Sequence, residues 1–109
     1  MASQSIEELY EYVLDRKNNP QSGSYTDYLY DKGLDKILKK VGEEATEVIV
    51  GAKNNRAELT YETADLLFHL MVLLVESGVS LAEVKAELGA RVGTKSRLHE
   101  RQDWRGGQQ

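Results

Sequence analysis

Hydrophobic residues recur three and four positions apart in several separate stretches of the chain, which is the spacing of an amphipathic α-helix. The helices predicted from this spacing cover residues 5–18, about 24–31, about 34–53 and about 57–77, and a last helix begins at residue 80. The pattern therefore predicts an all-α fold of four to five helices.

Local signals indicate where these helices begin and end. Ser5 and Ser80 each precede a glutamate by three positions, which forms a capping box typical of a helix start. Gly33 predicts a bend, and Gly78 predicts a helix end. The Asn54–Asn55 pair is expected to end the long helix before it, because asparagine tolerates the left-handed backbone conformation common at helix ends.

The helix predicted at 57–77 is apolar on nearly every side from Ala64 onward. The residues on the side away from Leu66 and Leu70 are Leu67, Phe68, Met71, Val72 and Val75. A helix that is hydrophobic all round is buried all round, and the other helices of so short a chain cannot surround it. We therefore expect a helical bundle that is completed by homodimerisation.

Two pairs of carboxylates lie within or beside the apolar faces of neighbouring helices. Side chains three or four positions apart share one helix face, so Glu44 pairs with Glu47, and Glu62 pairs with Asp65. On a helical wheel, Glu44 and Glu62 fall inside the apolar stripes of their helices. Glu47 and Asp65 fall at the edges of those stripes.

Carboxylates gathered beside a core are unfavourable unless they are paired, protonated or bound to a metal ion. Ordinary surface salt bridges do not explain why Glu44 and Glu62 occupy apolar stripes. An all-oxygen ligand set suits Mg²⁺ or Mn²⁺, so the sequence predicts a divalent-metal site. His69, one turn after Asp65, is either a satisfied core residue or a hydrogen-bond partner of Asp65.

Two lysines adjoin the first carboxylate pair. Lys36 and Lys40 fall on the wheel at the edge that Glu47 occupies. Helical ion pairs, Lys40 with Glu44 and Lys39 with Glu43, are one interpretation. Phosphate recognition is the other, and the two interpretations are compatible.

Composition narrows the class of protein. The chain has 109 residues, so we expect one domain, at residues 1–94, followed by a basic tail at 95–109. Its net charge of −4 argues against nucleic acid as the main partner. The absence of cysteine excludes disulfides and thiolate metal sites. The start does not read as a signal peptide, and the apolar run 64–75 is too short to span a membrane, so we expect no membrane association and a cytoplasmic location.

The carboxylate pattern resembles the motif of the all-α nucleotide pyrophosphohydrolases. It reads Glu43-Glu44-x-x-Glu47, then Glu62-x-x-Asp65. The segments that narrow the resemblance are Ser24–Thr26, Lys32–Val48 and Ala64–Leu70. With these segments, the chain resembles the phosphoribosyl-ATP pyrophosphatase family over about residues 5–92.

The resemblance implies Mg²⁺-dependent hydrolysis of phosphoribosyl-ATP to phosphoribosyl-AMP and pyrophosphate, the second step of histidine biosynthesis, by a homodimer. The metal ligands implied by the family pattern are Glu44, Glu47, Glu62 and Asp65. Glu47 or Glu43 would accept a proton from the attacking water. The implied substrate-binding residues are Ser24, Tyr25, Thr26, Lys36 and Lys40.

Two alternatives remain open from the sequence. A house-cleaning hydrolase of non-standard nucleoside triphosphates would use the same chemistry with a different base pocket. A helical dimerisation module without catalysis would explain the amphipathic helices. It would not explain acids in their apolar stripes.

Overall fold

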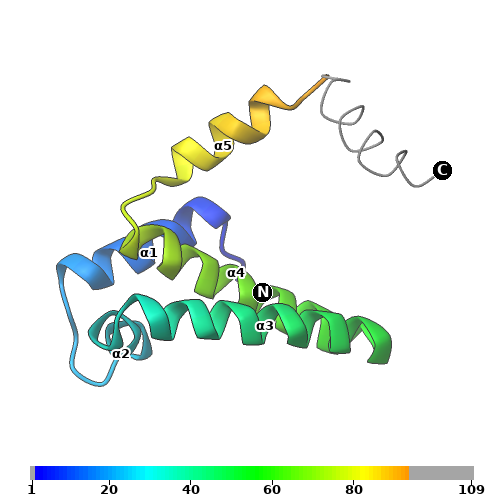
Figure 1. The fold of residues 1–109 in the computed structure, drawn as a ribbon, viewed down its shortest axis with the longest axis horizontal. Helices are drawn as coiled ribbons and strands as arrows, with labels where there is room; N and C mark the ends of the chain where they lie inside the picture. Colours follow the sequence, from blue (N-terminus) through cyan, green and yellow to red (C-terminus); the bar gives the residue numbers. More distant parts are fainter. Residues whose placement is uncertain (1, 94–109) are drawn as a thin grey trace.

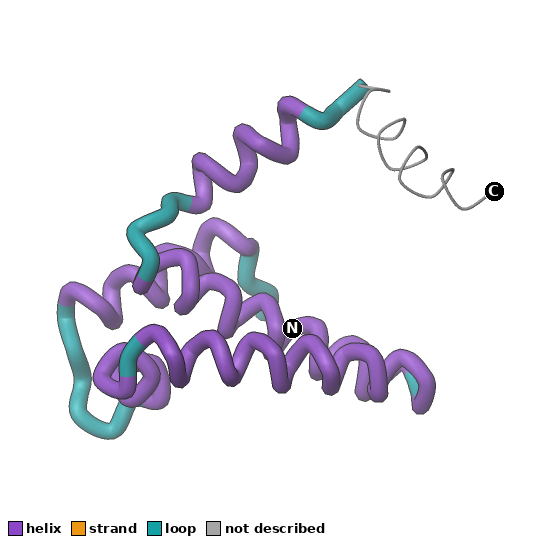
Figure 2. The backbone as a smooth tube through the Cα atoms, in the orientation of Figure 1, coloured by secondary structure: helices purple, strands orange, loops and turns teal. Residues whose placement is uncertain are grey.

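The computed structural model describes residues 2–93, and the basic tail predicted at 95–109 lies outside this range. Within residues 2–93 the chain forms five helices and no strand, which confirms the prediction of an all-α fold. The helices are α1 (Ile6–Asn18), α2 (Tyr25–Lys32), α3 (Leu34–Asn54), α4 (Arg56–Glu76) and α5 (Leu81–Ala90) (Figures 1 and 2).

The predicted helix starts are confirmed by their hydrogen bonds. Ser5 and Ser80 both form complete capping boxes with the glutamate three positions later. Gly33 joins α2 to α3 with a φ of 94°, a conformation that favours glycine. After α4, Gly78 adopts a φ of 72° while Val79 N–H donates to the Leu74 carbonyl, the pattern of a Schellman motif.

The expectation for the Asn54–Asn55 pair is right about the helix end but wrong about its cause. Asn55 has a φ of −165°, which is extended rather than left-handed. Its side-chain oxygen accepts a hydrogen bond from Glu58 N–H at 2.9 Å, so this residue caps the start of α4. A single residue therefore ends α3 and begins α4.

The two long helices, α3 and α4, form an antiparallel hairpin whose members run side by side (Figure 1). Gly51 allows them to approach closely near the turn. A Cβ atom at this position would lie 3.1–3.2 Å from backbone atoms of Glu58 and Leu59. The hairpin therefore depends on a residue without a side chain at this crossing.

The buried core lies at the other end of the hairpin, where α1 and α2 pack against it. Its members are Val13, Leu29, Ile37, Met71, Val72 and Val75. Two tyrosine hydroxyls connect elements around this core. Tyr30 Oη on α2 donates to the Val13 carbonyl on α1 at 2.8 Å, and Tyr10 Oη on α1 donates to the Val79 carbonyl after α4 at 2.9 Å. The end of the hairpin near Asn55 extends beyond this core.

Within this chain, α4 is not covered on every side. Met71, Val72 and Val75 are buried, but Leu67 and Leu59 are exposed. On the extended part of the hairpin, Ile49 is 68% exposed and Tyr61 is 69% exposed. The all-round burial expected for this helix is therefore incomplete within residues 2–93.

The last helix, α5, projects from the rest of the fold (Figure 1). None of its residues is buried, and Leu88 is exposed. The ion pair between Lys85 Nζ and Glu7 Oε2, at 2.6 Å, links it to α1. No single helix among residues 2–93 is long and apolar enough to cross a membrane, and only α4 and α5 together, with a 109° bend between them, meet both requirements.

Candidate functional site

The two predicted carboxylate pairs meet where the hairpin leaves the core. Glu44 on α3 faces Asp65 on α4, and Glu44 is only 7% exposed, as its place in the apolar stripe predicts. Ligand atoms of Glu44, Asp65 and His69 all lie within 4.8 Å of one another. This is a group of side chains that could hold a metal ion.

His69 is better placed to orient this group than to bind a metal ion. It is 2% exposed, and both of its ring nitrogens have partners. Nδ1 lies 2.8 Å from the backbone oxygen of Asp65 and must carry the proton to bond to it. Nε2 is then an acceptor, so the Tyr25 hydroxyl donates to it at 2.9 Å. Both interpretations of His69 hold: it is a satisfied core residue, and it contacts Asp65.

Burial and repulsion between neighbouring carboxylates raise the pKa values of Glu44 and Glu62. Burial, followed by the neighbouring Asp65 carboxylate, raises the pKa of Glu44, and Lys40 opposes this effect only in part. Burial, followed by the negative charges of Glu47 and Asp65, raises the pKa of Glu62. The four predicted ligands therefore form one electrostatic cluster across α3 and α4, which favours a bound cation.

Lys40 is the cation that contacts this cluster. Its Nζ lies 3.5 Å from Glu44 and 3.6 Å from Glu43. Burial alone would lower the pKa of Lys40, but the neighbouring Tyr25, Glu44 and Glu43 raise it overall, so the ammonium stays charged. The expected pair with Glu44 is confirmed, whereas Glu43 pairs with Lys40 instead of Lys39.

The remaining predicted ligands and catalytic groups are more accessible. Glu43 and Glu47 are exposed, and Glu62 is partly buried. Lys36 lies one turn before Lys40 on α3 and is partly buried. Substrate or water can therefore reach this side of the cluster from solvent.

The three predicted substrate residues at the start of α2 differ in their surroundings. Ser24 caps the helix by accepting a hydrogen bond from Asp27 N–H at 3.3 Å. Thr26 is 3% exposed and packs into the protein. Tyr25 is half-exposed and borders the carboxylates directly, so it has the most surface available to a ligand. The substrate roles of Ser24 and Thr26 stay predictions.

Tyr25 connects α2 to the carboxylate cluster. Its ring stacks between Tyr28 and Phe68, with centroids at 6.0 Å and 6.1 Å. Burial raises the pKa of Tyr25, and the Asp65 and Glu44 carboxylates raise it further against the effect of Lys40. The hydroxyl thus remains protonated and can donate to His69.

The sequence did not reveal the contact between Tyr25 and His69. The two residues are 44 positions apart, and helical periodicity relates only side chains on the same helix. The position of His69 one turn after Asp65 was the available signal. It identified one of the two partners of the imidazole.

The family model described as phosphoribosyl-ATP pyrophosphohydrolase matches residues 6–92. The chain belongs to the phosphoribosyl-ATP pyrophosphohydrolase family. A phosphoribosyl-ATP pyrophosphatase of Leuconostoc mesenteroides subsp. mesenteroides is 76% identical over 106 residues, which cover 97% of this chain and 93% of that protein.

Other relatives of the same name support membership of the phosphoribosyl-ATP pyrophosphohydrolase family. The protein from Streptococcus thermophilus is 63% identical over 99 residues, covering 90% of this chain and 95% of its own length. The protein from Limosilactobacillus fermentum is 65% identical over 99 residues, covering 90% of this chain and 93% of its own length. The matched region contains every predicted site residue.

The raised pKa of Glu44 has a consequence for stability. The folded state binds a proton here more tightly than the unfolded chain, so this residue's contribution to stability falls as pH rises through the folded pKa. At neutral pH without metal, Glu44→Gln should therefore raise the melting temperature, and the difference from the wild type should shrink on acidification. Lys40 keeps Glu43 as a partner in this variant.

Thermal melts with EDTA and with Mg²⁺ measure this effect. Added Mg²⁺ should stabilise the wild type and stabilise the Glu44→Gln variant much less. Glu11→Gln, at an exposed site on α1, is the matched control and should follow the wild type. A Glu44→Gln protein that melts lower than the wild type in EDTA, yet responds equally to Mg²⁺, would contradict the assignment.

Proposed function

We propose that this chain hydrolyses phosphoribosyl-ATP to phosphoribosyl-AMP and pyrophosphate, with Mg²⁺ or Mn²⁺ held by Glu44, Glu47, Glu62 and Asp65. The observation that carries the proposal is the buried Glu44 carboxylate facing Asp65 across the hairpin. The name shared by relatives up to 76% identical supports the choice of substrate.

The residues present suit a divalent cation. The ligands are carboxylates from two helices, they repel one another, and Lys40 alone offsets only part of their charge. Oxygen ligands of this kind are those that Mg²⁺ and Mn²⁺ prefer. When bound, such a cation polarises phosphoryl oxygens and neutralises the charge of the leaving pyrophosphate.

The chain's own cations complete the neutralisation of the triphosphate. Lys40 is already directed at the cluster through its ion pairs with Glu43 and Glu44. When phosphate oxygens replace these carboxylates as partners, the ammonium loses no charge–charge interaction. Lys36, one turn away on the same helix, extends the positive charge along the chain of phosphates.

The reaction breaks the bond between the α and β phosphates and adds water across it, so one carboxylate must accept a proton. Glu43 already forms an ion pair with Lys40, with Oε1 and Nζ 3.6 Å apart. Glu47 is exposed, and its charge acts on the neighbouring Glu62. Of the two candidates, Glu47 therefore fits the role of proton acceptor better.

Pyrophosphate release from phosphoribosyl-ATP, assayed beside a panel of nucleoside triphosphates, tests this function. Release should require Mg²⁺ or Mn²⁺, stop with EDTA, and be fastest with phosphoribosyl-ATP. Glu62→Gln should lower kcat/KM by about 100-fold, as expected for loss of a metal-binding group. The Glu11→Gln control should match the wild type. Faster release from ordinary or non-standard triphosphates would instead indicate a house-cleaning hydrolase, and no release from any substrate would favour a dimerisation module.

Replacing Lys40 distinguishes phosphate binding by this lysine from metal binding by the carboxylates. Lys40→Ala should raise KM for phosphoribosyl-ATP by about 10-fold or more, because a charge-assisted hydrogen bond to phosphate is lost. Calorimetric Mg²⁺ binding should persist, because no ligand is removed. Lys39→Ala, at the exposed neighbouring position, should leave KM unchanged. An unchanged KM in Lys40→Ala would remove this lysine from the substrate site.

We also propose that two copies of the chain pack as a homodimer. Support comes from the extended part of the hairpin, where Ile49, Tyr61 and Leu59 are exposed. On the projecting α5, Leu88 is exposed too. These apolar side chains stand outside the single-chain core, and a second copy would cover them.

Light scattering at micromolar concentration measures this association. The mass should equal two chains of 12.3 kDa each. Replacing Ile49 and Tyr61 with aspartate should shift the mass to one chain, because two charges would face an apolar interface. A wild-type mass of one chain at this concentration would overturn the dimer.

A further inference from the structure

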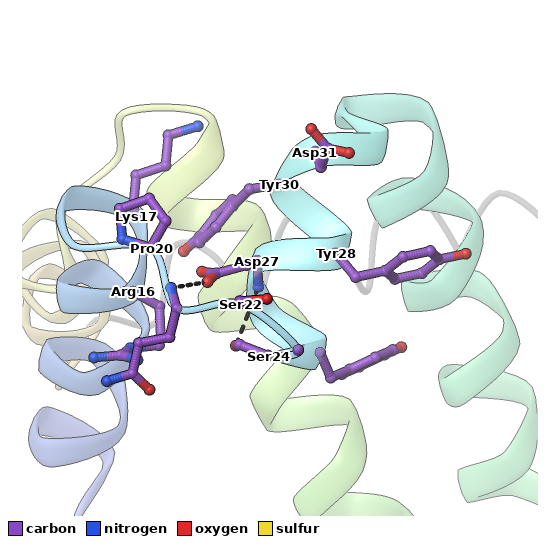
Figure 3. Close-up of a pocket in the computed structure, with 12 residues that line it drawn as sticks. Arg16, Lys17, Pro20, Ser22, Ser24, Asp27, Tyr28, Tyr30 and Asp31 are labelled. Carbon is purple, nitrogen blue, oxygen red and sulfur yellow. Dashed lines mark hydrogen bonds between the residues drawn. The ribbon is translucent and has the colours of Figure 1, made fainter.

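A recess lies between the end of α1, the loop at 19–24 and α2 (Figure 3). Its volume is about 780 Å³, which falls in the range of small-molecule sites. Arg16 reaches it from α1 and Asp27 reaches it from α2, while Tyr28 points away from Arg16, towards α3 (Figure 3). None of the metal-binding or phosphate-binding groups assigned above lines it.

Two buried polar atoms in this recess have no hydrogen-bond partner among residues 2–93. They are the Nε donor of Arg16 and the Oδ1 acceptor of Asp27. Buried polar atoms are nearly always satisfied in folded proteins, so such a pair requires an explanation. The two atoms are complementary in kind, because one donates from a cation and the other accepts on an anion.

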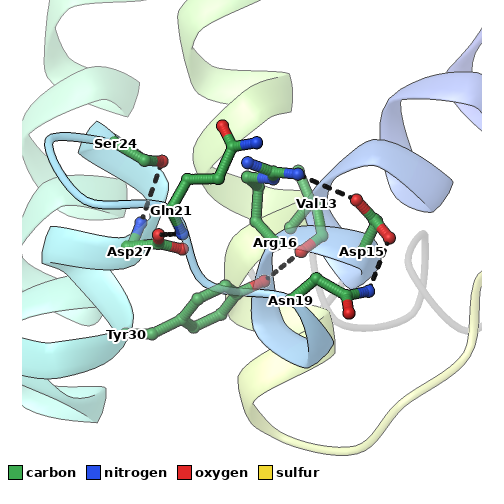
Figure 4. Close-up of polar contacts among 8 residues, drawn as sticks. All are labelled: Val13, Asp15, Arg16, Asn19, Gln21, Ser24, Asp27 and Tyr30. Carbon is green, nitrogen blue, oxygen red and sulfur yellow. Dashed lines mark hydrogen bonds and ion pairs between the residues drawn. The ribbon is translucent and has the colours of Figure 1, made fainter.

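Other atoms of both side chains contact the protein and position them. Arg16 Nη2 pairs with Asp15 at 2.9 Å, and its guanidinium lies 5.7 Å from the centre of the Tyr12 ring. Asp27 Oδ2 accepts a hydrogen bond from Gln21 N–H, which fastens the loop to α2 (Figure 4). Each side chain is thus held in place while a buried polar atom, Arg16 Nε or Asp27 Oδ1, has no partner among residues 2–93.

Tyr25 borders both the recess and the proposed reaction site. This residue lines the recess, and its hydroxyl bonds to His69 beside Asp65. Lys17 adds a second cation at the edge, where its Nζ pairs with Glu76 at 2.7 Å and lies 4.7 Å from the Tyr30 ring centre. This shared residue is the basis for connecting the recess with a substrate bound at the carboxylates.

We propose that this recess binds the phosphoribosyl group that distinguishes phosphoribosyl-ATP from ATP, an inference that rests on the proposed function. The Asp27 carboxylate accepts hydrogen bonds from the ribose hydroxyls, as acidic side chains do in other ribose sites. The Arg16 guanidinium donates to the phosphate. Arg16 and Asp27 are then the residues that select the substrate, while the carboxylate cluster performs the chemistry.

Calorimetry with ribose 5-phosphate in the presence of EDTA tests binding without turnover. EDTA removes metal-dependent binding at the carboxylate cluster, and loss of heat in the Arg16 and Asp27 variants described below assigns the remaining binding to the recess. Ribose 5-phosphate should bind the wild type, and inorganic phosphate or ribose should bind at least 10-fold more weakly, because each offers only half of the contacts. Absence of ribose 5-phosphate binding to the wild type would overturn the proposal.

Variants then separate the two contacts. Arg16→Met keeps the length of the side chain and removes the donor. Asp27→Asn keeps one oxygen for Gln21 N–H and turns the other group into a donor that cannot accept from a hydroxyl. Both should weaken ribose 5-phosphate binding and raise KM for phosphoribosyl-ATP by about 10-fold, with kcat changed far less. Lys53→Met, at the exposed end of α3, is the matched control and should change neither.

A melting curve for each variant shows that it is folded, and Asp27→Asn carries the test if Arg16→Met unfolds. Folded variants with wild-type KM would overturn the proposal. The proposed function fails differently, through a wild type that releases no pyrophosphate from phosphoribosyl-ATP. The calorimetric result with ribose 5-phosphate remains readable in that case.

Discussion

The buried carboxylate of Glu44, opposite Asp65, is the interaction on which the rest of the structure depends. A charge at 7% exposure beside a like charge is unfavourable in isolation. The surroundings offset this cost only in part, through the ammonium of Lys40. Protonation of Glu44 or a further positive charge would offset the rest. Folding and function thus place opposite demands on the same side chain.

The orientation of Asp65 depends on helices that belong to different parts of the chain. His69, held by Tyr25 from α2, bonds to the backbone of Asp65 on α4. Ser24 caps α2 and so fixes the start of the helix that carries Tyr25. A change in the loop before α2 would therefore reach the backbone of Asp65 through a short series of hydrogen bonds. This connection explains why a residue far from the acidic motif can matter to it.

Features that depend on residues close together in the chain, such as helix starts and the buried face of a helix, could be predicted from the sequence. Ser5 and Ser80 bond to groups three positions away, and Glu44 lies in the apolar stripe of its own helix. Features that require contact between helices were out of reach. The bond between Tyr25 and His69 is an example, and so is the pair of buried atoms on Arg16 and Asp27.

The sequence predictions were wrong where one residue interacts with two neighbouring parts of the structure. Asn55 was expected to end a helix in a left-handed conformation, yet it is extended because its side chain caps the following helix. Glu43 pairs with Lys40 and not with Lys39, because Lys40 is already directed towards Glu44. Both cases follow from competition between partners, which a single-helix pattern does not describe.

The connection between α3 and α4 is one residue long, and this limits insertions and deletions in the hairpin. Asn55 leaves no slack, so the position of each carboxylate relative to its partner across the hairpin is set by the number of residues between them. A codon gained or lost between Glu47 and Glu62 would rotate one pair by about 100° relative to the other. Substitutions outside Gly51 and Asn55 need not disturb this alignment, whereas a change of length would separate the predicted ligands. The number of residues in this part of the hairpin is therefore more tightly constrained than the identity of its exposed side chains.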